Sequence, residues 1–178
     1  MTTGHVFIAT SLDGYVARQD HSLDWLTRQP GISEEESGFA AFMDSVDGLV
    51  MGTGSFRKVL GFGQWPYSKP VIVLSSSLTS GDIPGHLQGK VQLSRASPAG
   101  LMQELQQEGW RRAYIDGGRL VQSFLRQGLI ADLTITTVPV LIGSGISLFG
   151  PLGSDIGLEL KASRRLGTGM VQNTYRIV

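Results

Sequence analysis

The sequence has no cysteine among its 178 residues. This excludes disulfides, thiolate metal sites, iron–sulfur clusters and cysteine nucleophiles. It also excludes the zinc-dependent nucleobase deaminases, which need two cysteines beside a histidine or a third cysteine. The three histidines, His5, His21 and His86, are isolated and show no metal-ligand spacing, so we expect loop or surface positions for them and no metal site.

An excess of either charge is also absent, because 15 Lys and Arg residues balance 15 Asp and Glu residues. A nucleic-acid binder needs a basic face for counterion release, so no nucleic-acid partner is expected. The apolar runs are too short to span a bilayer, so no membrane partner is expected either. The opening residues 1–5 lack the basic and apolar regions of a signal peptide, which predicts a cytoplasmic protein.

The length suits one domain over residues 1–178 with a sizeable core. Short strand-like runs alternate with helix-like runs, and the last third is rich in strands. This order predicts an α/β fold with a mostly parallel central sheet, an antiparallel C-terminal hairpin and helices on both faces. The expected strands are 5–10, 48–51, 70–74, 90–93, 113–116, 132–142, 158–166 and 170–177, with helices starting near Ser33, Ser97 and Gly117.

Glycine is abundant, since 24 of 178 residues is roughly twice the usual share of about 7%. Several glycines fall at strand ends, where the backbone can approach a phosphate and helix amides can bind an anion. The alternative for each segment is an ordinary turn. The Rossmann, P-loop and nucleophile-elbow motifs are all absent. The strand ends concerned are Asp13-Gly14, Gly52-Thr53-Gly54-Ser55, Ser75-Ser76-Ser77 and Gly117-Gly118.

Taken in order, these segments resemble the dihydrofolate-reductase-like superfamily, and in particular the reductase domain of the bifunctional riboflavin-biosynthesis deaminase–reductase. Ser11-Leu12-Asp13-Gly14 is similar to its S-L-D-G segment, and residues 115–118 are similar to its E-G-G segment. Residues 50–56 resemble the M-G-R-x-T segment of dihydrofolate reductases, and residues 71–76 resemble their I-I-L-S-S segment. Leu23-Asp24-Trp25-Leu26 is similar to a segment of small stand-alone relatives.

The resemblance implies a dihydrofolate-reductase-like fold that binds NADPH at the strand ends and transfers a hydride to a small-molecule substrate. It places Gly52, Thr53, Gly54 and Ser55 along the cofactor phosphates, and Ser75 and Ser76 beside the adenosine ribose phosphate. It places Gly117, Gly118 and Arg119 at the pyrophosphate, and Leu12, Asp13 and Gly14 in a mobile loop over the nicotinamide.

The sequence departs from the family pattern at three positions. Thr53 replaces a phosphate-binding arginine, so the choice between NADPH and NADH stays open, and Arg57 or Lys58 could substitute from the next helical turn. Phe7 replaces a lysine, and Asp116 replaces the glutamate of E-G-G. The replacements at Phe7 and Asp116 weaken the case that the substrate is the phosphoribosylaminouracil of the family.

Three acids, Asp13, Asp116 and Glu36, are candidates for proton donation. Asp13 could instead shape a turn. Glu36 could anchor a substrate ring or act as the capping-box partner of Ser33. Trp25 and Trp65 could wall the pocket or pack in the core.

The residues and the resemblance leave three alternative functions open. The first is an NADPH-dependent reductase resembling the 5-amino-6-(5-phosphoribosylamino)uracil reductase of riboflavin biosynthesis, without a deaminase domain. The second is a dihydrofolate or pterin reductase, which requires Glu36 to face the nicotinamide pocket. The third is a nucleotide-binding protein without turnover. The strand-rich tail predicts a homodimer, because long apolar strands need cover and family members pair through this region.

Overall fold

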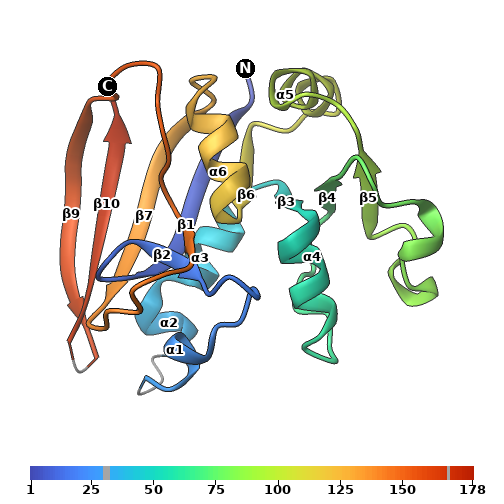
Figure 1. Ribbon diagram of the computed structural model, residues 1–178. Coiled ribbons are helices and arrows are strands. Elements are labelled where there is room, and N and C mark those ends of the chain that lie inside the picture. Colours follow the sequence, from blue (N-terminus) through green and yellow to red (C-terminus); the bar gives the residue numbers. More distant parts are fainter. Residues whose placement is uncertain (30–32, 168) are drawn as a thin grey trace.

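The computed structural model describes residues 1–29, 33–167 and 169–178. Its centre is an eight-stranded sheet with the order β5-β4-β3-β6-β1-β7-β10-β9 (Figure 1). A separate two-stranded ribbon pairs β2 with β8. The strands are β1 (Thr3–Ser11), β2 (Tyr15–Ala17), β3 (Gly48–Gly52), β4 (Val71–Leu74), β5 (Val91–Ser94), β6 (Arg112–Asp116), β7 (Ile130–Val138), β8 (Ile146–Ser147), β9 (Leu158–Leu166) and β10 (Met170–Ile177).

Six α-helices and two 3-10 turns are found among the described residues. None of these helices is long and apolar enough to cross a membrane. The helices are α1 (Asp24–Thr27), α2 (Glu34–Ser37), α3 (Phe39–Ser45), α4 (Thr53–Leu60), α5 (Pro98–Gln107) and α6 (Gly118–Leu125), and the 3-10 turns are Ser80–Asp82 and Gly85–Leu87.

Neighbouring strands from β5 to β7 run parallel across the sheet. β10 is antiparallel to β7, and β9 is antiparallel to β10. The predicted α/β fold with a mostly parallel sheet and an antiparallel C-terminal hairpin is therefore confirmed. The two hairpin strands, β9 and β10, also have the predicted bounds.

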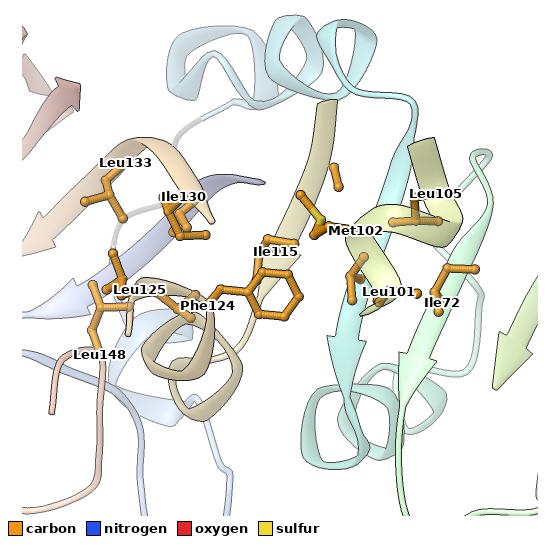
Figure 2. Close-up of a cluster of buried hydrophobic side chains, with 14 residues drawn as sticks. Ile72, Leu101, Met102, Leu105, Ile115, Phe124, Leu125, Ile130, Leu133 and Leu148 are labelled. Carbon is orange, nitrogen blue, oxygen red and sulfur yellow. The ribbon is translucent and has the colours of Figure 1, made fainter. Parts of the chain in front are cut away.

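The two faces of the sheet bury separate cores, because successive side chains of a strand point to opposite faces. On β3, Val50 joins one core, whereas Leu49 and Met51 join the other. The first core lies under α5 and α6, and Figure 2 shows Leu101 and Phe124 entering it from these two helices. The second core packs against α3 and α4. Helices therefore cover both faces, as predicted.

The start of α5 follows directly from its sequence. Ser97 is the N-cap, and its Oγ accepts a hydrogen bond from the Gly100 N–H at 3.1 Å. Pro98 is the first helical residue, where its missing N–H leaves no partner unsatisfied. Gly109 then has a φ of 90°, which is the left-handed conformation that commonly ends a helix.

Several local features differ from the sequence prediction. His5 was expected in a loop or at the surface, but it is buried in β1. The strand expected over 132–142 is β7, which ends at Val138. The segment Gly52–Ser55 was expected to be a tight turn, but its last three residues form the first turn of α4. The helix expected from Ser33 through Val46 is divided at Gly38, whose φ is 76°. The ribbon of β2 and β8 was not expected, because strands of three and two residues are too short to show a period of two.

Candidate active site

A cavity of about 860 Å³ lies at the carboxyl ends of β3 and β6, between the starts of α4 and α6. Ligands of open α/β sheets collect at this edge. The segment after β2 and the middle of β1 complete the walls. Eight of the predicted site residues line this cavity: Gly52, Thr53, Gly54, Ser55, Asp116, Gly117, Gly118 and Arg119.

Two helices begin at this cavity without a side-chain cap. Gly52 precedes α4 and Gly117 precedes α6, and neither glycine has a side chain that could cap the first turn of its helix. The first N–H groups of a helix have no partner within the helix, and together with the helix dipole they attract anions. A Cβ on Gly52 would meet no atom within 4 Å, so a ligand has room to approach this backbone.

Gly117 is required by the geometry of the second helix start. Its φ is 99°, a conformation that L side chains rarely adopt. A Cβ at this position would lie 2.7 Å from Ser55 Oγ, which is closer than any van der Waals contact allows. The two helix starts therefore approach each other through a glycine and a small hydroxyl side chain.

The first turn of α4 connects the cavity to three neighbouring segments. The Thr53 hydroxyl donates a hydrogen bond to Ser75 Oγ at 2.8 Å, which joins α4 to the end of β4. Gly54 packs against the ring of His21, and the Ser55 hydroxyl acts on the Asp116 carboxyl by lowering its pKa. Successive residues of this turn thus face β4, the segment after β2, and β6.

His21 lines the cavity, which no pattern in the sequence predicts. Its φ is 64°, and it is the one residue other than glycine with a positive φ in the described part of the chain. Strained residues of this kind cluster at ligand sites. The strand-like and helix-like patterns contain no signal for His21, because its position depends on the path of a loop.

Asp116 lines the cavity at the end of β6. Burial raises the pKa of its carboxyl above the usual value, and hydrogen bonds from Tyr114, Ser55 and the Gly117 N–H oppose the shift without cancelling it. The Tyr114 hydroxyl is 3.3 Å from Asp116 Oδ1, and it donates to the Phe7 carbonyl oxygen at 2.9 Å. A carboxyl with a raised pKa keeps its proton to higher pH and can donate it to a ligand.

The RibD C-terminal domain family model matches residues 3–172. The chain belongs to this family. The family resemblance predicted from the sequence is thereby confirmed, and membership in this RibD reductase-like family indicates an oxidoreductase.

Individual relatives agree with this assignment. The uncharacterized protein YwjB of Bacillus subtilis is 31% identical over 163 residues, which are 91% of each chain. A candidate riboflavin biosynthesis protein of Shewanella sp. PV-4 is 40% identical, with a TM-score of 0.92 over 99% of both chains. The deaminase/5-amino-6-(5-phosphoribosylamino)uracil reductase of Thermotoga maritima shares the fold with 12% identity and a TM-score of 0.76. It is matched over 57% of its length and 99% of this chain.

The S-L-D-G segment of this RibD-like domain lies outside the cavity lining. The Asp13 carboxylate accepts hydrogen bonds from the Ser11 hydroxyl and from the N–H groups of Ile142 and Gly143. These bonds hold the pKa of Asp13 below its usual value, and the carboxylate is exposed. Asp13 therefore shapes a turn and anchors the segment after β7. This is the structural alternative to a role in proton donation. Leu12 and Gly14 also lie outside the lining.

Glu36 also lies outside the cavity lining. Its backbone N–H donates to Ser33 Oγ at 2.9 Å, which is one half of the expected capping box. Its carboxylate accepts a hydrogen bond from the Gly167 N–H at 2.8 Å, so it joins α2 to the loop between β9 and β10. In this chain the Glu36 side chain therefore holds the hairpin against α2.

The remaining predicted residues lie near the cavity or in the cores. Ser75 is buried and bonds Thr53, whereas Ser76 is exposed, and neither lines the cavity. Trp25 is buried in a core with Val138, and Trp65 packs edge-on against Phe56 and Tyr67, so neither tryptophan forms a cavity wall. The aromatic side chains in the lining are Phe7, Phe62, Tyr67 and Tyr114.

Proposed function

We propose that this chain is an NADPH-dependent reductase related to the reductases of riboflavin biosynthesis. One observation carries the proposal: two helix starts without side-chain caps, preceded by Gly52 and Gly117, meet at a cavity that contains Asp116. The helix starts suit the phosphates of a dinucleotide, and the buried carboxyl suits proton transfer.

The residues present fit a nicotinamide dinucleotide. The N–H groups at the start of α6, including those of Gly118 and Arg119, would hold the pyrophosphate, and Arg119 adds a positive charge. The open space at Gly52 lets the backbone approach the cofactor. When bound, the nicotinamide supplies the hydride for the reduction. Asp116 would hold a proton next to the substrate and deliver it to the atom that gains negative charge.

Arg57 and Lys58 are the residues that would favour NADPH over NADH. Both line the cavity, where the sequence has Thr53 in place of a phosphate-binding arginine. Converting both to alanine should lower the ratio of NADPH to NADH affinity by about tenfold, because charge-assisted hydrogen bonds to the extra phosphate of NADPH would be lost. An Arg126→Ala variant at the end of α6 is the matched control. An unchanged ratio would remove this role from both residues.

The experiment that tests the cofactor site compares two glycines of similar conformation. Gly117 has a φ of 99° and Gly109 a φ of 90°, so alanine is strained to a similar degree at both positions. A Cβ meets Ser55 Oγ at Gly117 but no atom at Gly109. NADPH binding followed by its fluorescence should be lost in Gly117→Ala and retained in Gly109→Ala. Equal binding by both variants, or no binding by the unaltered protein, would contradict the proposal.

Turnover is tested by following NADPH oxidation with the purified protein. The panel contains 5-amino-6-(5-phosphoribosylamino)uracil, dihydrofolate and small carbonyl compounds. A nucleotide-binding protein without turnover would bind NADPH and oxidise it with none of them. The dihydrofolate alternative required Glu36 in the cavity, and its carboxylate instead bonds Gly167.

A further inference from the structure

The ring of His21 lies at the start of α4, on the wall of the cavity. A Cβ built on Gly54, in the first turn of this helix, would be 2.9 Å from His21 Nδ1 and 3.5 Å from Nε2. Both ring nitrogens therefore lie beside the turn whose N–H groups have no partner within the helix. Within the described residues, neither ring nitrogen has a hydrogen-bond partner.

The loop after β2 holds its shape without the imidazole. The Arg18 N–H donates to the Ser22 carbonyl oxygen, and the His21 N–H donates to the Arg18 carbonyl oxygen, both at 3.0 Å. Asp20 Oδ1 accepts a hydrogen bond from the Ser22 N–H at 2.9 Å. These bonds close the loop through backbone groups and one carboxylate. The ring of His21 is therefore available to a ligand in the cavity.

The first turn of α4 has no positive side chain of its own. Thr53 stands where the family resemblance has a phosphate-binding arginine, and its hydroxyl donates to Ser75 Oγ at 2.8 Å. Gly54 has no side chain, and the side chain of Ser55 is uncharged. A cation beside these N–H groups therefore has to come from another part of the chain, and His21 already lies there.

Other titratable groups from several elements also face the cavity. They are Arg57 and Lys58 of α4, Arg119 of α6, Asp116 and Tyr114 of β6, Tyr67, and Asp20 of the loop itself. Arg18 and Asp24 pair with each other next to this loop. Burial raises the pKa of both phenols, so they stay neutral near pH 7. Burial also raises the pKa of Asp116, so its ionisation has to be separated from that of His21.

We propose that protonated His21 binds the pyrophosphate of the dinucleotide together with Arg119, so that each helix start has one cation beside it. The proposal rests on the proposed function, since it names a further residue of the cofactor site. The two helix starts meet where Ser55 approaches Gly117, and His21 lies against the residue before Ser55. The pyrophosphate assigned to the start of α6 would therefore lie within reach of His21.

Two consequences follow for the cofactor. Arg57 and Lys58 come three and four residues after Gly54, one helical turn away from His21, which leaves the ribose phosphate of NADPH to them. Histidine changes its charge between about pH 5 and 8, and its charged form is favoured at the lower pH. An anion beside His21 should therefore bind more tightly as the pH falls.

The test measures the Kd of NADPH by fluorescence at pH 6 and pH 8. Asparagine tolerates a positive φ and carries no charge, so His21→Asn keeps the loop and removes the cation. The variant should bind about tenfold more weakly than the unaltered protein at pH 6, as for the loss of a hydrogen bond to a charged group, but less than about twofold more weakly at pH 8. Protonation of NADPH itself affects both proteins alike and cancels in this ratio.

His86→Asn is the matched control. His86 is exposed in the 3-10 turn Gly85–Leu87 and lies outside the cavity lining, so the Kd should equal that of the unaltered protein at both pH values. Asp116→Asn is the second control. It should keep the difference between pH 6 and pH 8, because the titrating group is His21.

Adenosine diphosphate ribose identifies the phosphate concerned, because it has the pyrophosphate, lacks the ribose phosphate of NADPH and keeps its charge between pH 6 and pH 8. Its Kd, measured by displacement of NADPH, should rise about tenfold from pH 6 to pH 8 in the unaltered protein and much less in His21→Asn.

Equal losses of affinity in His21→Asn at the two pH values would overturn the proposal, because the shape of the ring and not its charge would then explain them. So would a pH effect restricted to NADPH, which would place His21 at the ribose phosphate, or an effect that Asp116→Asn abolishes and His21→Asn retains. Failure of the unaltered protein to bind NADPH at either pH would instead contradict the proposed function.

Discussion

The ring of His21 occupies the space that a side chain on Gly54 would need. A Cβ on Gly54 would lie 2.6 Å from His21 Cε1 and 2.9 Å from Nδ1. His21 reaches this position with a φ of 64°, which is costly for a residue other than glycine. The loop after β2 and the first turn of α4 are therefore fitted to each other at the wall of the cavity.

The first prediction concerns this fit. Gly54→Ala should displace His21 and weaken NADPH binding by at least about threefold, a coupling typical of residues in contact. His21→Gly combined with Gly54→Ala should recover part of this loss, because glycine frees the space and accepts the positive φ. Fluorescence titration of the two single variants and the double variant measures the coupling. Additive losses would show that the contact has no role in binding.

The second prediction concerns the pH dependence of stability. Hydrogen bonds from Ser11, Gly143 and Ile142 hold the pKa of Asp13 below its ordinary value of 3.8. The resulting stabilisation is complete above the unfolded pKa and is lost as the pH falls through the folded pKa. Asp13→Asn should therefore lower the Tm more at pH 7 than at pH 3.

Thermal unfolding followed by circular dichroism at the two pH values measures this difference. Asp155→Asn is the control, because Asp155 is exposed in the loop after β8. Equal decreases in Tm at pH 7 and pH 3 for Asp13→Asn would show that the charge of Asp13 is not what anchors the segment.

The third prediction concerns proton transfer. Because burial raises the pKa of Asp116, the rate of reduction should fall as the pH rises through that pKa. Asp116→Asn should remove this pH dependence and lower kcat by about 100-fold, as for the loss of a general acid. The rate measured against pH with a reducible substrate tests both effects. An unchanged pH profile would assign the proton donor to another group.

The raised pKa also has a consequence for folding. A carboxyl whose folded pKa exceeds its unfolded value contributes stability below the unfolded pKa and loses it as the pH rises. Asp116→Asn removes this unfavourable ionisation, so the variant should resist unfolding at pH 8 at least as well as the unaltered protein. Loss of activity with retained stability would separate a chemical role from a structural one.

The fourth prediction concerns assembly. We propose that the protein forms a homodimer through the β9–β10 hairpin, where Leu158, Leu160 and Val171 are 45%, 55% and 40% exposed. Leu160→Lys should lower the dimer fraction in light scattering over a concentration series. Leu12→Lys is the control, because Leu12 is 62% exposed on the β1–β2 loop. A monomer at every concentration of the unaltered protein would refute the proposal.

The residues whose positions were predicted correctly have neighbours in the sequence that mark the ends of strands and helices. Gly117 and Gly118 follow a buried strand and precede an amphipathic helix, so their place at a helix start follows from neighbouring residues alone. The two strands of the C-terminal hairpin were predicted within their observed bounds for a similar reason. Their boundaries are marked by Gly167 and Gly169.

The residues that the sequence did not reveal depend on tertiary contacts. His21, Phe62 and Tyr67 reach the cavity from loops, and a loop has no period that predicts where its side chains point. Asp13 and Glu36 have the residue type of an acid catalyst, but the chain directs both toward backbone N–H groups elsewhere. Residue type was thus sufficient to nominate the acids, and only the fold could distinguish Asp116 from the other two.

We expect the two helix starts that lack side-chain caps to couple the stability of this molecule to anion binding. An anion that bonds the N–H groups after Gly52 and Gly117 completes both helices, whereas the unfolded chain offers it no such site. By linkage, a ligand present at 100 times its Kd stabilises the folded state by about 2.7 kcal/mol. Thermal melting can therefore rank nucleotides and ring compounds for this protein before any reaction has been found.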